Sequence, residues 1–167
     1  MNQVERNKQA KLSEHFKLGE LTRSKSHPEV YNIPSHVHIE NLKRVCVWLE
    51  ALRERYNLRY VLAGSEVLRG AGEPIIITSG YRSVELNRKV GGVATSNHLT
   101  GCAVDIRVAG KEQLIRYTCI LLDYADETKQ DFDELLLEHG SKGVIWLHFA
   151  VRPPTQQNRR KISFLQG

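Results

Sequence analysis

A loop that leads into a β-strand is predicted by the residues Ser96-Asn97-His98-Leu99-Thr100-Gly101-Cys102-Ala103-Val104-Asp105. Gly101 permits a tight turn there, because glycine adopts backbone conformations that other residues avoid. The alternating side chains of residues 102–108 are typical of a strand with one face toward the core. The turn and the strand together bring a loop histidine, His98, and a strand carboxylate, Asp105, toward one point. The segment therefore predicts a pair of functional side chains at the start of a strand.

Helices and strands flank this segment in a pattern that predicts an α+β fold. The expected helices are 36–56, 83–89 and 111–124, and the expected strands are 75–78, 102–108, 132–138 and 144–151. The first helix has one apolar stripe, at Leu42, Val45, Cys46, Leu49 and Leu52. Only residues 139–143 separate the last two strands, which indicates an antiparallel hairpin. We therefore expect helices packed on one side of a small, largely antiparallel sheet.

The length of 167 residues suits one compact domain, and a composition of 41% hydrophobic and 26% charged residues suits a globular core. The expected organisation is a polar lead-in at 1–14, a domain at 15–155 and a basic tail at 156–167. The tail carries Arg159-Arg160-Lys161, which is more commonly solvated than a binding patch. No apolar run is long enough to cross a bilayer, so membrane insertion is not expected.

The net charge of +5 suits an anionic polymer of the cell wall as well as a nucleic acid. Basic residues are spread along the chain, and no basic-aromatic motif for nucleic acids is present. Nucleic acid is therefore not an expected partner. Three cysteines, Cys46, Cys102 and Cys119, form no Cys-x-x-Cys pair, and their odd number predicts buried thiols in a reduced protein.

A second histidine completes a pattern that suits a metal ion. Trp146-Leu147-His148 follows Asp105 after 43 residues (148 − 105), on the expected last strand of the domain. A catalytic zinc site typically has three His or carboxylate ligands and one open position for water. Taken singly, a histidine in a loop is usually a surface residue, and an aspartate in a strand usually caps or pairs with another group. As a set, preceded by Ser79-Gly80-Tyr81-Arg82-Ser83, these residues favour a metal site.

These motifs, in this order, resemble the M15 peptidase family over about residues 15–151. They look closest to the compact subgroup with a Ser-Gly-Tyr-Arg-Ser strand end, a Ser-x-His-x-x-Gly-x-Ala-x-Asp motif and a Trp-x-His strand. The resemblance implies that His98, Asp105 and His148 bind one Zn²⁺ per chain, in a cleft on the sheet. It further implies hydrolysis of peptide bonds in peptidoglycan stem peptides, by a carboxypeptidase or an endopeptidase.

Two further residues gain roles from the resemblance. Arg82 resembles the family arginine that holds a substrate carboxylate or carbonyl, and its planar guanidinium suits a carboxylate. A surface salt bridge is the alternative for Arg82. Ser96 resembles a residue near the substrate, with a turn-forming serine as an equal alternative.

The general base departs from the family pattern, because the usual positions hold Ile145 and Trp146, which cannot accept a proton. Glu138, on the neighbouring strand and on the same face as Leu136, is the expected substitute, followed by His139. An exposed strand-end glutamate is the alternative. If Glu138 is not the base, the second function is a catalytically impaired, zinc-containing module that binds cell-wall peptides.

The sequence also gives expectations for how the protein reaches the cell wall and for its oligomeric state. Residues 1–12 are polar and charged and lack the pattern of a secretory signal peptide. We therefore expect synthesis in the cytoplasm and release to the wall by a phage-type or other export route. A monomer is the expected state.

Overall fold

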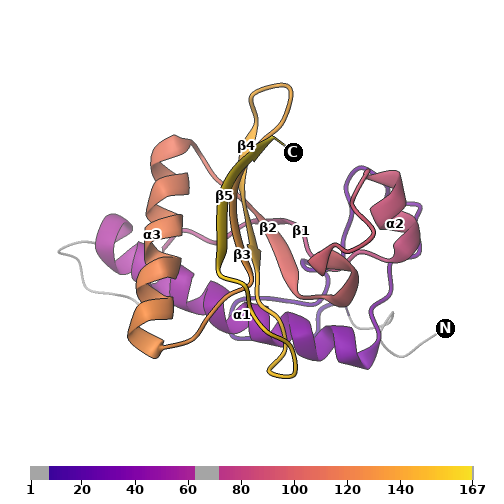
Figure 1. Ribbon diagram of the computed structural model, residues 1–167, viewed down its shortest axis with the longest axis horizontal. Helices are drawn as coiled ribbons and strands as arrows, with labels where there is room; N and C mark the ends of the chain where they lie inside the picture. The colour runs from indigo at the N-terminus through magenta and orange to yellow at the C-terminus, as the bar shows by residue number, and fades with distance from the viewer. Residues whose placement is uncertain (1–7, 63–71, 167) are drawn as a thin grey trace.

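The computed structural model describes residues 8–62 and 72–166. The described part of the chain has the expected α+β fold, and its sheet has five strands in the order β1-β2-β4-β3-β5 (Figure 1). Its elements are α1 (His36–Tyr56), η2 (Asn57–Val61), β1 (Ile77–Ser79), α2 (Val84–Lys89), η3 (Asn97–Thr100), β2 (Ala103–Arg107), α3 (Lys111–Thr128), β3 (Glu134–His139), β4 (Ile145–Ala150) and β5 (Lys161–Gln166). All neighbouring strands are antiparallel except β3 and β5, which are parallel.

One face of the sheet packs against α1 and α3 and forms the core. Ser35 caps the N-terminus of helix α1, and its hydroxyl accepts a hydrogen bond from the backbone N–H of His38 in a capping box. The strand residues that are buried in this core are Ile77, Val104, Ile106, Leu135, Leu137, Leu147 and Phe149. Because side chains alternate along a strand, Asp105 and His148 project from the opposite face. Figure 1 shows α3 on one side of the sheet and α2 on the other.

The prediction of a basic tail at 156–167 is wrong for residues 161–166. These residues form β5, which pairs with β3 along its whole length. Strand β3 would otherwise present an unpaired edge, and β5 satisfies its backbone groups. The turn into β5 is fixed by ion pairs between Arg159 and Asp133 and between Arg160 and Asp126. Local sequence could not predict the strand, because the backbone groups and carboxylates that hold it lie elsewhere in the chain.

Smaller differences concern strand bounds and cysteines. The strand expected at 75–78 is β1, Ile77–Ser79. Cys46 and Cys102 are buried as expected, but Cys119 is exposed on α3, so the prediction was wrong for that thiol. The expected lead-in lies partly outside the described residues, at 1–7. Among the described residues, none of the helices combines enough length and hydrophobicity to span a bilayer.

Candidate metal centre

The two histidines and the aspartate predicted from the sequence lie together on the face of the sheet opposite α1 and α3. Asp105 on β2 and His148 on β4 are direct cross-strand neighbours, and His98 reaches them from η3. One ligand atom from each residue lies within 4.8 Å of the others, and all three residues are buried. Gly101 ends η3 in a left-handed conformation (φ 72°), which turns the chain from His98 into β2.

Both imidazole rings are oriented by hydrogen bonds on the side away from the cluster. The Nδ1 atom of His98 lies 2.7 Å from the carbonyl oxygen of Gly80, which makes Nδ1 the protonated nitrogen and leaves the lone pair on Nε2. The Nε2 atom of His148 lies 3.1 Å from a carboxylate oxygen of Glu134, which leaves Nδ1 toward Asp105. Hydrogen bonds of this kind orient metal-binding histidines and fix their tautomers.

The donor set and its spacing fit a zinc ion. Oδ1 of Asp105 lies 3.0 Å from Nδ1 of His148 and 3.3 Å from Nε2 of His98. Zinc–nitrogen and zinc–oxygen bonds of about 2.0–2.1 Å in a tetrahedron place neighbouring ligand atoms about 3.3 Å apart. Two imidazoles and one carboxylate also match the ligand types of catalytic zinc sites, which keep a fourth position for water. The three side chains can therefore hold zinc with little rearrangement.

The cluster is strongly coupled electrostatically. Burial alone would raise the pKa of Asp105, but the two histidines outweigh it and hold this pKa well below its ordinary range. Burial lowers the pKa of His98. Burial opposes the charged form of His148 too, yet hydrogen bonds to Asp105 and Glu134 raise its pKa to about 9. Asp105 thus stays ionised, as a carboxylate ligand of a metal ion must be.

Arg82 lies against the cluster, where the sequence placed it. Its Nη2 donates to Oδ2 of Asp105 at 2.8 Å, and its Nε donates to the hydroxyl of Ser79 at 2.9 Å. The backbone N–H of Arg82 also donates to the carbonyl of His98. Within the described residues Nη1 has no hydrogen-bond partner, so one edge of the guanidinium still offers donors to a ligand.

Two glutamates flank His148 on β3, and they differ in their surroundings. Glu138 lies opposite Trp146 and is half-buried, and burial raises its pKa. Its carboxylate is close enough to His148, Asp105 and Arg82 for their charges to act on its pKa. Glu134 is hydrogen-bonded to His148, Asn97 and Arg159, and the bond to His148 does most to lower its pKa to about 2. Glu138 thus has a raised pKa, whereas Glu134 stays ionised and orients His148.

Sequence reasoning missed Glu134 and the network behind it. Asp133, whose side chain has no exposed surface, accepts two hydrogen bonds from the guanidinium of Arg159, at 2.9 and 2.6 Å. Asn97, which precedes His98, donates to Asp133 and Glu134 at 2.7 and 3.0 Å. The segment before β5 therefore supports both histidines. The sequence did contain a signal for Glu134. Alternate residues of a strand project from the same face, so Glu134 lies on the face of Leu136 and Glu138.

Ser96 acts on the backbone. Its hydroxyl accepts a hydrogen bond from the backbone N–H of His98 at 3.3 Å and caps η3. This contact is the turn-forming alternative for Ser96, and it helps to position the loop that carries His98.

Comparison with known families gives the class of the protein. A family model described as Peptidase M15 matches residues 14–121, which is more than half of the chain. The chain belongs to the M15 peptidase family. The match contains Arg82, His98 and Asp105 and ends before Glu134, Glu138 and His148, which the structure brings to the same site. No curated protein matches the chain.

Proposed function

We propose that this chain is a zinc-dependent peptidase that hydrolyses peptide bonds in peptidoglycan stem peptides, as a carboxypeptidase or an endopeptidase. The observation that carries the proposal is the convergence of His98 Nε2, Asp105 Oδ1 and His148 Nδ1, with the other nitrogen of each histidine held by Gly80 or Glu134. Bound zinc supplies Lewis acidity at the scissile carbonyl and makes an attacking water more acidic. Membership of the M15 family supports this chemistry.

Glu138 is the general base in this proposal. Its carboxylate accepts a proton from the attacking water and returns that proton to the nitrogen of the leaving amine. A raised pKa suits this exchange, because a base works best when its pKa approaches the working pH. Glu134 is unsuited to the role, because three hydrogen-bond partners occupy its oxygens and its lowered pKa makes it a weak base.

Arg82 binds the substrate beside the metal. The nitrogen Nη1 and the second hydrogen of Nη2 donate to a carboxylate or carbonyl of the stem peptide. Its ion pair with Asp105 fixes the guanidinium in place, so the substrate meets a preorganised donor. The arginine thereby sets which peptide bond lies over the zinc.

Digestion of purified peptidoglycan tests the proposal, with the released fragments identified by mass. Release of single terminal residues indicates a carboxypeptidase, and release of longer peptides indicates an endopeptidase. A protein that binds zinc and stem peptides but releases no fragment is the non-catalytic binding module instead.

A further inference from the structure

A second hollow adjoins the metal centre through Arg82. It has a volume of about 250 Å³, and its walls come from the loop at 23–26, from β1 and from α2. The residues that line it include the cations Arg23, Lys25 and Arg82, the hydroxyl residues Thr78 and Ser79, and the apolar Leu86. A hollow of this size is smaller than the sites that enclose whole small molecules, which span roughly 300–1,000 Å³. It suits one residue or terminal group of a longer substrate.

The lining of this hollow is basic and rich in hydroxyl groups. Three of its side chains are cations, and none of its described lining residues is acidic. Within residues 8–62 and 72–166, neither Arg23 nor Lys25 forms an ion pair. The guanidinium of Arg23 donates to the carbonyl of Ile77 at 3.4 Å, which holds it beside β1. The hollow therefore has an excess of positive charge that no described side chain neutralises.

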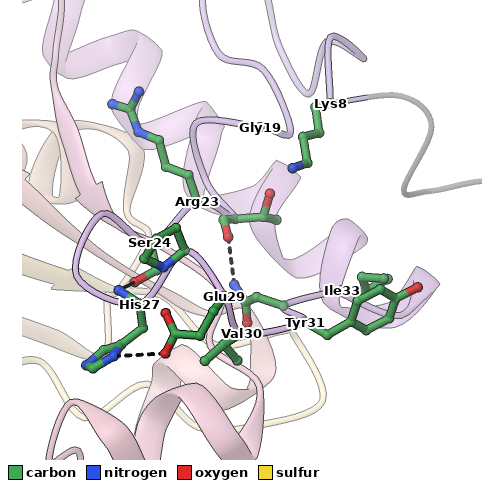
Figure 2. Close-up of a pocket in the computed structure, with 12 residues that line it drawn as sticks. Lys8, Gly19, Arg23, Ser24, His27, Glu29, Val30, Tyr31 and Ile33 are labelled. Atoms are coloured by element: carbon green, nitrogen blue, oxygen red, sulfur yellow. Dashed lines mark hydrogen bonds and ion pairs between the residues drawn. The ribbon is translucent and has the colours of Figure 1, made fainter.

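Glu29 lines the pocket next to the hollow, together with Arg23, and it is paired with other cations. Figure 2 shows the neighbouring pocket, where the Arg23 side chain points away from Glu29. Glu29 pairs with His27 at 3.4 Å and with Lys89 at 2.9 Å. Hydrogen bonding to Lys89 is the main cause that lowers the pKa of Glu29, to about 2. This carboxylate thus stays ionised and matched by its own cations, and Arg23 keeps its charge for a ligand.

Arg82 joins the hollow to the metal centre. It lines the hollow and contacts Asp105, so a group held there lies beside the residues proposed to cleave the substrate. The guanidinium forks of the two arginines and the hydroxyl of Ser79 can donate hydrogen bonds with the geometry that carboxylates accept, while the Thr78 hydroxyl donates to the backbone carbonyl of Asp105. A neutral amide carries less negative charge on its oxygen and gains less from such donors.

We propose that this hollow is a substrate subsite for a carboxylate of the stem peptide, and that Arg23 and Lys25 determine the preference for that charge. The inference rests on the proposed peptidase function and adds the class of group that the substrate presents next to the scissile bond. Arg23 and Lys25 act in binding and orientation only. They are specificity residues, distinct from the hydrolytic residues at the zinc.

The test pairs charge removal on the protein with charge removal on the substrate. A synthetic stem peptide is compared with analogues in which each carboxylate in turn becomes a carboxamide. For the wild-type protein, kcat/KM on one analogue should fall roughly 3- to 10-fold, as expected for partly exposed ion pairs. In the double variant R23Q/K25Q, the ratio of kcat/KM on the parent peptide to kcat/KM on that analogue should approach one. The preference should also weaken as salt is raised, because exposed charges are screened.

A matched control separates the subsite from bulk charge. The double variant R88Q/K111Q removes two exposed cations that do not line the hollow, so its preference should equal that of the wild type. The proposal is wrong if R23Q/K25Q keeps the wild-type preference, or if the control variant loses it equally. Zinc content and thermal unfolding confirm that each variant is folded.

A binding measurement keeps the two proposals separable. Titration calorimetry gives the dissociation constants of the same peptides with zinc-loaded protein, whether or not they are cleaved. If no peptide is hydrolysed but the dissociation constants show the preference and R23Q/K25Q removes it, the subsite stands and the peptidase function fails. If the peptides are cleaved without any preference, the peptidase function stands and the subsite fails.

Discussion

Asp105 and His148 face each other across β2 and β4, with 3.0 Å between Oδ1 and Nδ1. The register of two paired strands sets this contact, while His98 arrives from a short capped helix. A slip of one residue between the strands would turn one of the pair into the core, because side chains alternate. The metal centre is therefore built mainly on two paired strands, which position side chains more precisely than loops do.

The variant Glu138→Gln tests whether Glu138 is the general base, as distinct from Glu134, which orients His148. Loss of the proton acceptor should lower kcat by about two to four orders of magnitude, with zinc content retained. Steady-state kinetics on a defined stem peptide measure the first effect, and elemental analysis the second. Glu134→Gln is the matched comparison on the same strand, and it should weaken zinc binding instead. Wild-type kcat in Glu138→Gln would move the base elsewhere.

Arg159→Ala tests the support that the C-terminal segment gives to the zinc ligands. The variant removes the ion pairs to Asp133 and Glu134, and loss of such outer contacts typically weakens metal binding about 10- to 100-fold. Competition with a fluorescent chelator measures the zinc affinity. Arg160→Ala is the control, because Arg160 pairs with Asp126 and Asp131 instead. Equal zinc affinities of the two variants would show that Arg159 does not support the site.

Arg82→Lys keeps the positive charge but loses the planar fork. We expect it to raise KM, lower kcat/KM, or both, with zinc retained, and to rescue little of what Arg82→Ala loses. Kinetics of the two variants on one stem peptide provide the measurement. Wild-type kinetics in Arg82→Ala would remove Arg82 from substrate binding.

Stability at acidic pH should depend on Asp133. Burial would raise the pKa of Asp133, but hydrogen bonds from Arg159 and Asn97 outweigh it and lower the pKa below the ordinary 3.8. A lowered pKa in the folded state stabilises the protein above pH 3.8, and this contribution is lost as the pH falls through the folded-state pKa.

Urea unfolding of the chelator-treated protein at several pH values measures this contribution. Asp133→Asn should lower the free energy of unfolding at neutral pH by about 3 kcal/mol, as for a broken buried ion pair. It should also flatten the dependence on pH below about 4. An Asn variant with an unchanged acid-induced loss of stability would show that other carboxylates dominate it.

Local patterns in the sequence predicted the parts of the fold that depend on neighbouring residues. The apolar stripe of α1 and the alternation in β2 are local features, and both elements formed where expected, as did β3 and β4 to within two residues at each end. Strand β5 was missed because it depends on the free edge of β3. The hydrogen bond between Arg159 and Asp133 was missed for a similar reason, since its partners are 26 residues apart in the sequence and meet only in the folded chain.

Zinc content of the purified chain, by elemental analysis, tests the central claim most directly. Convergence of His98, Asp105 and His148 predicts about one zinc per chain in the wild type after dialysis against a weak chelator. It predicts a near-complete loss in His148→Ala, with the fold retained by circular dichroism. A full complement of zinc in His148→Ala, or none in the wild type after incubation with zinc, would contradict the account.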